Sequence, residues 1–410
     1  MIAEIIAVGD ELTSGQRLDT NSQWLSQRLG EIGIPVLFHS TVGDDLAACV
    51  SVFRIAMSRA NVIVTTGGLG PTADDLTRQA IAEASGDELE FRQELFDHIE
   101  QMFTRRGRSM PERNRVQAMM PTGSQSIPNP HGTAPGVELA THVSGNSART
   151  FALPGVPVEM KEMWEETVYD RIRSIPETPS NVIRHHRLKC FGIGESHCEE
   201  RLPDLIRRGR TPSVGITVHR GTITLRVTSV GESDEACKSQ MVPTINTIRD
   251  CLGDLVFGEE EDELSDVTLN LLHDRKETVA VCEWGTAGLL NQWLGSCDPV
   301  GDCFAGGIVL RSIEQLGGDA PESSSCTCEP LAKHMAKIAR DRFNATYGIA
   351  VSAFPRGLNP EERYAIAVSS PQKTIVKSNR LAAHPDIHRD LAAKQAINLL
   401  RLHVSRMDDA

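Results

Sequence analysis

Short apolar runs alternate with amphipathic stretches over the first part of the chain. Runs rich in β-branched and aliphatic residues predict three strands, at residues 2–8, 35–42 and 61–65. Helical periodicity follows the strands, and Asp19 or Thr20 can cap the first of these helices. Strands that alternate with helices predict a parallel β-sheet covered by helices on both faces, which is a three-layer α/β fold.

The pattern continues to residue 175 with longer elements. An amphipathic helix is predicted around residues 95–103, and a second helix over 158–175 follows a strand near Phe151. Between them, residues 121–136 are rich in proline and glycine, which predicts one long ordered loop. Long loops in compact domains are usually functional, so this loop is a candidate part of a binding site.

Changes in composition divide the chain into three predicted domains, at residues 1–175, 181–258 and 264–407. In the middle domain, the clean alternation of residues 222–228 indicates a strand with one buried face, as expected for a small α+β module. The acidic run at residues 259–263 is interpreted as a linker. In the last domain, an α/β pattern places strands at residues 278–282, 306–310 and 364–368.

Composition and charge restrict the possible functions. With 40% apolar and 24% charged residues, the 410-residue chain is globular, and its longest apolar runs are too short for a membrane segment. The formal net charge of −13 argues against nucleic acid as a partner, since nucleic-acid binding needs a basic surface. Ten scattered cysteines predict reduced thiols, and no signal-peptide pattern opens the chain, so a cytoplasmic location is expected.

A glycine-rich loop follows the third predicted strand, at the carboxyl end where ligands bind in sheets of this type. Gly67, Gly68 and Gly70 permit tight turns and bring backbone N–H groups close to a ligand, which suits phosphate. Asp74 and Asp75 follow, and they would repel a phosphate unless a divalent cation lay between them. We therefore predict a phosphate site with a metal ion held by Asp74 and Asp75. The alternative is that one of them caps the next helix.

Two more acidic residues belong to the same predicted edge of the sheet. Asp10 and Glu11 follow the first strand and would join Asp74 and Asp75 in a cluster of four carboxylates. Such a cluster is unfavourable unless cations or shared protons offset the repulsion. The alternative is that Asp10 and Glu11 only solvate a turn. The loop at residues 129–136 adds amide, imidazole, hydroxyl and backbone groups that could contact the same ligand.

In six segments, taken in order, the first domain resembles the CinA (competence/damage-inducible) family, whose first domain belongs to the molybdopterin-binding superfamily. The segments are Gly9–Leu12 with Asp19–Ser22, Val42–Asp45, Thr66–Thr77, Asn114–Pro121, Asn129–Gly136 and Leu153–Met160. The resemblance implies a domain that binds a nucleotide-like ligand. In this family the domain is associated with metal-dependent hydrolysis of the pyrophosphate in ADP-ribose.

This resemblance completes the set of candidate site residues. The candidate catalytic residues are Asp10, Glu11, Asp74 and Asp75, of which the two last would hold the metal. The candidate nucleotide- and phosphate-binding residues are Gly9, Thr66, Gly67, Gly68, Gly70, Thr72, Asn129, Gly132, Thr133 and Gly155. The expected cofactor is a divalent ion, Mg²⁺, Mn²⁺ or Co²⁺, with a monovalent cation as a further candidate. The expected partner is an ADP-ribose-like nucleotide.

The two other domains resemble the same family with less complete motifs. The middle domain is similar to a KH-like module but lacks the Gly-x-x-Gly clamp for nucleic acid. The last domain looks like the family's nicotinamide-mononucleotide deamidase domain, with Trp284 in place of the serine nucleophile. Arg311 and Leu316 replace a tyrosine and a lysine, and residues 352–357 replace a Thr-Gly-x-x-Gly-Pro element. Because an indole has no nucleophilic oxygen, we predict no deamidase activity.

Three functions remain open on this basis. The first is metal-dependent hydrolysis of ADP-ribose or a related nucleotide. The second is a nucleotide or pterin sensor without turnover, which the altered last domain favours. The third is adenylylation of molybdopterin, which ranks behind the others because the middle and last domains are not those of molybdenum-pathway enzymes. A homodimer is expected from the family resemblance only.

Overall fold

The computed structural model describes residues 1–176, 178, 180–316, 328–355, 363–381 and 383–406. The chain divides into two compact units. The first consists of Met1–Arg184 with Val230–Lys238, and the second of His185–Ser229 with Ser239–Ala410. Within the described residues, no helix is both long and apolar enough to cross a membrane.

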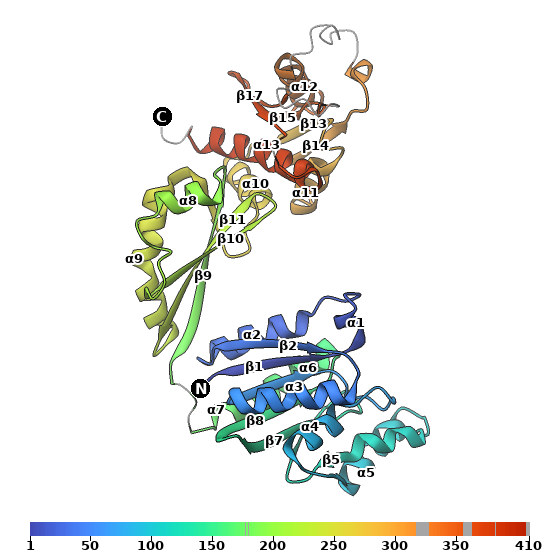
Figure 1. Cartoon of the computed structure of the whole chain (residues 1–410). Coiled ribbons are helices and arrows are strands. Elements are labelled where there is room, and N and C mark those ends of the chain that lie inside the picture. The colour runs from blue at the N-terminus through green and yellow to red at the C-terminus, as the bar shows by residue number, and fades with distance from the viewer. Residues whose placement is uncertain (177, 179, 317–327, 356–362, 382, 407–410) are drawn as a thin grey trace. The chain divides into compact units, whose positions relative to one another are not determined.

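A six-stranded sheet forms the centre of the first unit (Figure 1). Its strands are β1 (Ala3–Val8), β2 (Val36–Val42), β3 (Val62–Thr66), β6 (Gln125–Ile127), β7 (Gly136–Val143) and β8 (Asn146–Leu153). They lie in the order β2-β1-β3-β8-β7-β6, and the four strands from β2 to β8 are parallel. The predicted α/β fold with a parallel sheet is confirmed. Strand β7 runs antiparallel to β8, because Ser144 and Gly145 adopt positive φ and join the two strands in a tight turn, and the edge strand β6 runs antiparallel to β7.

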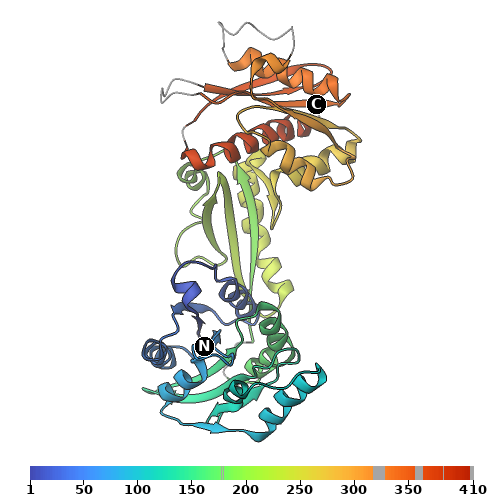
Figure 2. The ribbon, with the colours of Figure 1, turned by 90° about the vertical axis from the view of Figure 1, so that its right-hand side faces the viewer.

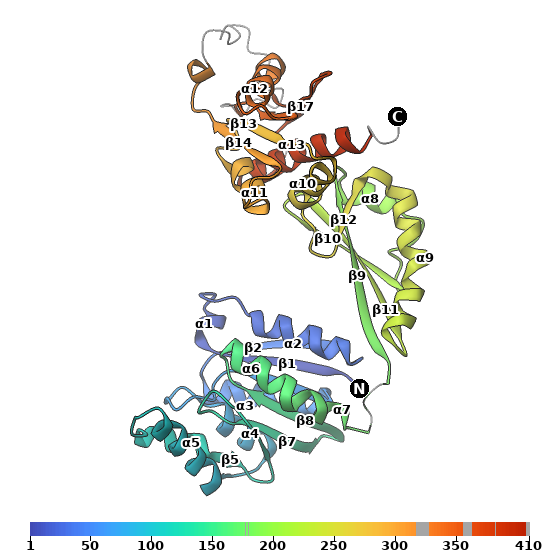
Figure 3. The same cartoon turned by 180° about the vertical axis from the view of Figure 1, so that it is seen from behind.

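Helices cover both faces of this sheet, as predicted. The elements are α1 (Asp10–Thr13), α2 (Thr20–Glu31), α3 (Leu46–Arg59), α4 (Thr77–Ser85), α6 (Pro157–Met163), a π-helical turn (Trp164–Val168) and α7 (Tyr169–Arg173). Successive strand residues face opposite ways, so Ile6 packs with α3 and α4, whereas Ile5 packs with α2 and α6. Figure 1 shows α3 in front of the sheet, and Figure 3 shows α6 and α7 from behind.

Several boundaries differ from the sequence-based expectation. A small satellite layer consists of β4 (Leu89–Phe91), α5 (Gln93–Arg105), a 3-10 helix (Glu112–Ala118) and β5 (Met119–Pro121). The predicted single loop over 121–136 is wrong in part, because strand β6 interrupts it and pairs with β7. The predicted cap at Asp19 is confirmed, since its carboxylate accepts a hydrogen bond from Ser22 N–H at 2.9 Å.

The second unit contains a four-stranded sheet in the order β10-β11-β9-β12. Its elements are β9 (Val182–Phe191), α8 (Glu195–Arg201), β10 (Ser213–His219), β11 (Thr222–Gly231), α9 (Asp234–Leu252), a 3-10 turn (Gly253–Leu255) and β12 (Val256–Glu259). Residues 260–263 connect β12 to α10, so the acidic run is a link as expected, except that Glu259 belongs to β12. Glu260 and Glu261 form ion pairs with Arg187 of β9, so opposite charge holds this link against the sheet.

The last part of the second unit is a five-stranded sheet in the order β14-β13-β15-β16-β17. Its elements are α10 (Leu264–Arg275), β13 (Val279–Glu283), α11 (Leu289–Cys297), β14 (Phe304–Val309), a 3-10 turn (Ile313–Leu316), α12 (Cys328–Arg342), β15 (Tyr347–Val351), β16 (Arg363–Ser369), β17 (Thr374–Arg380), a 3-10 turn (Pro385–Ile387) and α13 (His388–Ser405). Helices α12 and α13 pack on opposite faces (Figure 2). The strands predicted here are confirmed, whereas residues 356–357 of the third motif lie outside the described residues.

Candidate functional site

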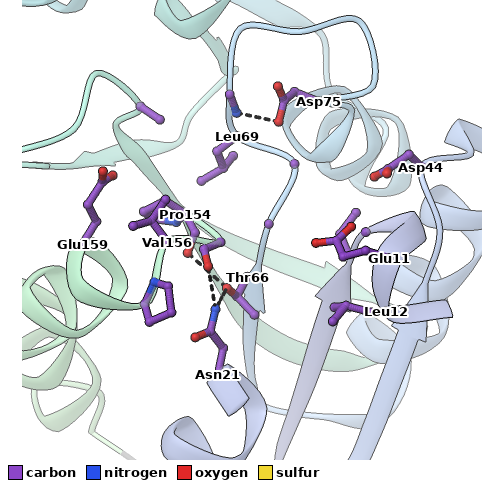
Figure 4. Close-up of a pocket in the computed structure, with 18 of the residues that line it drawn as sticks. Glu11, Leu12, Asn21, Asp44, Thr66, Leu69, Asp75, Pro154, Val156 and Glu159 are labelled. Carbon is purple, nitrogen blue, oxygen red and sulfur yellow. Dashed lines mark hydrogen bonds between the residues drawn. The ribbon is translucent and has the colours of Figure 1, made fainter. Parts of the chain in front are cut away.

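A cavity of about 530 Å³ opens at the carboxyl ends of the parallel strands of the first unit (Figure 4). Its walls come from the segments that follow β1, β3 and β8, together with the start of α2. The candidate residues Gly9, Glu11, Thr66, Gly67, Gly68, Gly70, Asp74, Asp75, Thr133 and Gly155 all line it. Segments far apart in the sequence thus meet at this edge, as sequence analysis predicts.

The glycine loop can follow its path only with glycine at its first turn. Gly67 has φ +103°, and a Cβ atom at this position would lie 2.2 Å from the carbonyl oxygen of Val8. Its N–H donates to Leu153 O at 3.1 Å, which ties the loop to β8. The Gly70 N–H is also used, because it donates to Asp75 at 2.7 Å. Within the described residues, the N–H groups of Gly68 and Leu69 have no such acceptor, so they are the ones left for a ligand.

Asp75 organises the glycine loop. One carboxylate oxygen accepts from Gly70 N–H, and the other accepts from the N–H of Thr72 at 2.9 Å and from its hydroxyl. Thr72 itself does not line the cavity. Neither Asp74 nor Asp75 caps the helix, because α4 begins at Thr77 after an uncapped Leu76, so the capping alternative is wrong. Asp75 therefore holds the glycine loop in shape through both of its carboxylate oxygens.

A buried arginine supports the same loop from below. Arg78 is 3% exposed, and its guanidinium donates to Leu69 O at 2.6 Å. Burial lowers the pKa of Arg78 to about 10, which leaves it charged at neutral pH, and the nearby Asp75 opposes this shift. The result is a fixed positive charge beneath a loop that faces an acidic cavity. The sequence pattern does not single out Arg78, because an arginine inside a predicted helix usually faces solvent.

Asp10 and Asp44 hold the ends of β1 and β2 together. Asp10 N–H donates to the Asp44 carboxylate at 3.0 Å, and Asp44 N–H donates to the Asp10 carboxylate at 3.0 Å. Asp44 lines the cavity, whereas Asp10 does not. The structure therefore brings Asp10 close to the candidate site but uses its carboxylate to position Asp44. Glu11 lines the cavity, with its carboxylate folded back over Gly9.

Negative side chains dominate the cavity wall. Six carboxylates line it, from Glu11, Asp19, Asp44, Asp74, Asp75 and Glu159, and Arg17 is the one basic residue among the described lining residues. The pKa of Asp44 is raised, first by burial and then by the charges of Asp10, Asp74 and Glu11. Asp44 is therefore close enough to Asp10, Asp74 and Glu11 for their charges to repel its own.

The arrangement suits a metal ion only together with a ligand. Within the described residues, no three His, Cys, Asp or Glu side chains come together to hold an ion by themselves. Mg²⁺ in nucleotide sites is usually held by one or two carboxylates together with phosphate oxygens and waters. Asp74, which is exposed, and Asp44 provide carboxylates of this kind at the cavity wall. The donor set thus fits an ion shared with a phosphate and does not form a complete cage.

The opposite wall is held by an amide that sequence analysis passed over. Asn21, at the start of α2, donates to the Thr66 hydroxyl and to Gly155 O, both at 3.0 Å. Thr66 in turn donates to Pro154 O at 3.1 Å, so that three segments are joined (Figure 4). Asn21 lies 45 and 134 residues from its two partners. No local pattern could therefore have identified its role.

The proline-rich loop contributes less than expected. Asn129 is buried and donates to Ala134 O at 3.0 Å and to Glu159 at 2.8 Å, while Gly132 N–H donates back to it at 2.8 Å. Asn129 and Gly132 line a second cavity of about 310 Å³, and only Thr133 of these candidates reaches the main one. Asn129 and Gly132 therefore stabilise the conformation of the loop and do not line the main cavity.

In the last domain, aromatic side chains occupy the position of the altered motif. Trp284 follows β13, and its backbone N–H donates to Val351 O at 3.0 Å. A Cβ atom at Gly285 would lie 2.5 Å from the ring of Phe354, so this ring closes over the loop. Trp284 and Leu316 pack against the same apolar cluster, and Arg311 is exposed. No candidate nucleophile stands at residue 284.

A buried glutamate fixes that loop instead. Glu283 is fully buried and accepts hydrogen bonds from the Thr286 hydroxyl at 2.6 Å and from the side-chain amide of Asn291 at 2.6 Å. The N–H groups of Leu290 and Asn291 also donate to it, at 3.1 and 3.0 Å. The Thr286 hydroxyl donates to Glu283, and because Thr286 is only 1% exposed, a substrate cannot reach it in this structure.

Comparison with known proteins agrees with this domain order. Residues 4–174 match the family model "Probable molybdopterin binding domain", residues 185–258 match "Damage-inducible protein CinA KH domain", and residues 261–404 match "CinA C-terminal domain". A CinA-like protein of Trichormus variabilis is 36% identical over 98% of this chain and 99% of its own length. A CinA-like protein of Dictyoglomus thermophilum is 35% identical over 88% of each chain.

Among solved structures, the protein CinA from Thermoplasma acidophilum, which is described as having unknown function, is 31% identical. The match covers 41% of this chain and 96% of that one, with a TM-score of 0.37. The two relatives match 88% and 98% of this chain at 35% and 36% identity, and the three family models together extend from residue 4 to residue 404. The chain belongs to the CinA family.

Proposed function

We propose that the first unit hydrolyses the pyrophosphate bond of ADP-ribose or a related nucleotide in a metal-dependent reaction. The observation that carries the proposal is the convergence of Glu11, Asp44 and Asp74 on a cavity that also contains a glycine loop. An anionic ligand would be repelled from such a wall, so an anion and a cation are expected to bind together. A divalent ion shared between the carboxylates and the phosphates would polarise a phosphoryl oxygen and lower the pKa of a bound water.

Each group of the site has a separate task in this proposal. The N–H groups of Gly68 and Leu69 bind phosphate oxygens, and Arg78 holds the loop in shape from below. Asp74 and Asp44 hold the ion, Asp10 positions Asp44, and Glu11 orients the ligand or the attacking water. Asp75 is assigned to the loop rather than to the metal, because both of its oxygens already accept hydrogen bonds.

The test is release of AMP from ADP-ribose by the full-length protein with Mg²⁺, Mn²⁺ or Co²⁺. Asp74→Asn should lose most of the activity and keep the wild-type melting temperature, since Asp74 is exposed. Asp45→Asn is the matched control, because Asp45 caps α3 through Ala48 N–H at 2.8 Å and Asn caps equally well. An unchanged rate in Asp74→Asn would remove the proposed mechanism.

A second candidate function is a nucleotide or pterin sensor without turnover. The observation that favours it is the structural use of Asp10 and Asp75, which leaves fewer free carboxylates than the sequence predicts. Thermal stabilisation of the wild type by AMP or ADP-ribose, without product on chromatography, would select this function.

For the last domain we propose the absence of nicotinamide-mononucleotide deamidase activity. The support is Trp284 in place of a nucleophile, the ring of Phe354 against Gly285, and the burial of Thr286, which is 1% exposed. The test is ammonia release from nicotinamide mononucleotide by the wild-type protein. Turnover comparable with that on ADP-ribose would refute this assignment.

A further inference from the structure

The two ends of the main cavity differ in chemistry, and the difference follows the order of the strands. Asp44 follows β2 and Glu11 follows β1, so these two carboxylates lie at that end, whereas Asp19, which caps α2, and Glu159, which accepts a hydrogen bond from Asn129, lie at the end of Leu18 and Val156. The glycine loop follows β3 in the middle, and Val156 follows β8 at the other end. Neighbouring strands lie about 4.8 Å apart, so this series spans about 14 Å from β2 to β8. Figure 4 shows Glu11 and Asp44 on the opposite side of the loop from Val156.

Two large aliphatic side chains are exposed to solvent at the end of the cavity that follows β8. Leu18 is 85% exposed and Val156 is 52% exposed, and both line the cavity. Their backbones are linked through Asn21, which lies three residues after Leu18 and bonds Gly155, the neighbour of Val156. The turn that carries Leu18 is fixed, because Thr20 N–H donates to Leu18 O at 3.1 Å and Asp19 caps α2. The pair is thus held in place at one end of the cavity.

Exposed apolar surface of this kind gains free energy when a ligand covers it. A phosphate or a sugar hydroxyl would gain nothing from Leu18 or Val156, whereas a flat heterocyclic ring that contacts them would remove apolar surface from water. Asp44 and Glu11 would repel the phosphates of a nucleotide unless a cation lay between them, and their carboxylates can bind that cation. A base at Leu18 and Val156 and a cation at Asp44 and Glu11 would place the phosphates between the two, at the glycine loop.

We propose that Leu18 and Val156 form the nucleobase subsite of the cavity, with the ligand's phosphates at the glycine loop and its cation at the acidic end. This inference rests on the proposed binding of a nucleotide in the first unit. It does not depend on hydrolysis, so it applies equally to a sensor. It makes Leu18 and Val156 specificity-determining residues: they select a phosphate compound that carries a base over one that does not.

The experiment compares the affinities of AMP and ribose 5-phosphate by calorimetry on the full-length protein with Mg²⁺. The variants are Leu18→Ser, Val156→Ser and their combination. Val158→Ser is the matched control, since Val158 is 74% exposed, lies two residues from Val156 and does not line the cavity. We expect the wild type to prefer AMP by about 10-fold or more, as one or two buried aliphatic contacts provide.

In the combined variant, AMP affinity should fall by about 10-fold and ribose 5-phosphate affinity should stay unchanged, which abolishes the preference. Val158→Ser should behave as the wild type. A preference for AMP that survives in the combined variant would overturn the subsite, and so would an equal loss of both ligands. If the wild type binds neither AMP, ribose 5-phosphate nor ADP-ribose, the proposed function itself fails, and the subsite with it.

Discussion

Asp10 and Asp44 exchange hydrogen bonds between their carboxylates and each other's backbone N–H groups, both at 3.0 Å. Each residue lies just beyond the carboxyl end of its strand, β1 for Asp10 and β2 for Asp44. These two hydrogen bonds hold the ends of β1 and β2 together at one edge of the cavity. They also place the Asp44 carboxylate where its negative charge is repelled by those of Asp74 and Glu11. The acidic end is therefore built into the backbone arrangement and is not an incidental cluster of surface charges.

The first prediction concerns the pH dependence of stability. The pKa of Asp44 is raised above 3.8 in the folded protein, so the charged form is disfavoured there. The native state therefore loses stability from this group as the pH rises through the folded pKa. Asp44→Asn keeps an acceptor for Asp10 N–H, and at pH 7 without divalent ions it should raise the free energy of unfolding by less than about 1 kcal/mol.

The gain from Asp44→Asn should disappear as the pH falls below 3.8, where the wild-type carboxyl is protonated in both states. Melting temperatures measured from pH 3 to pH 8 check this, with Asp45→Asn as control. A gain that is independent of pH would show that charge repulsion at Asp44 is not its cause.

The second prediction separates the two adjacent aspartates of the glycine loop. Asp75→Ala removes the acceptors of Gly70 N–H and Thr72 N–H and should cost about 1–2 kcal/mol of stability, with loss of AMP binding. Asp74→Asn should lower activity without changing stability. Thermal unfolding and calorimetry on both variants provide the measurements. Equal destabilisation by the two substitutions would contradict the assignment of Asp75 to the loop.

The third prediction concerns the buried arginine under that loop. Arg78→Leu leaves Leu69 O with only a long contact of 3.5 Å to Gln117, so we expect a loss of about 2 kcal/mol and weaker phosphate binding. Arg54→Leu is the control, because Arg54 is exposed and donates to Glu83 O on the surface; it should change stability by about 0.5 kcal/mol or less. If chemical denaturation shows the same loss of stability for Arg78→Leu and Arg54→Leu, Arg78 does not stabilise the glycine loop as proposed.

The fourth prediction concerns the last domain. Trp284→Ser restores a hydroxyl, yet it should release no ammonia from nicotinamide mononucleotide, because Phe354 closes over Gly285 and Arg311 and Leu316 remain. Removal of the partly buried indole should instead lower stability by about 2 kcal/mol. Ammonia release by the single variant would show that residue 284 alone determines activity.

Patterns that depend on neighbouring residues could be predicted from the sequence. The β-branched runs gave β1, β2 and β3 nearly at their observed bounds, and the glycine loop was placed at the correct edge because strand ends and turns are local features. Strand β6 was missed, since three residues beside prolines carry too little periodicity to indicate a strand. The ion pairs of the acidic run at 259–263 could not be predicted, because their partner Arg187 lies more than 70 residues away.

The candidate site shows the same division. Its glycine and aspartate residues have a recognisable spacing, and most of them line the cavity. The different tasks of Asp74 and Asp75 could not be read from the sequence, because they depend on which carboxylate turns toward the N–H groups of the loop. Asp44, Asn21 and Arg78 were missed for a related reason: each acts through a partner in another element.

The most direct test of the central claim is a crystal structure of the full-length protein with ADP-ribose and Mn²⁺, which is located by its anomalous signal. The account predicts the pyrophosphate beside Gly68 and Leu69, with the Mn²⁺ peak between the phosphates and Asp74. A nucleotide bound beside Trp284 instead, or Mn²⁺ bound away from both Asp74 and Asp44, would contradict it.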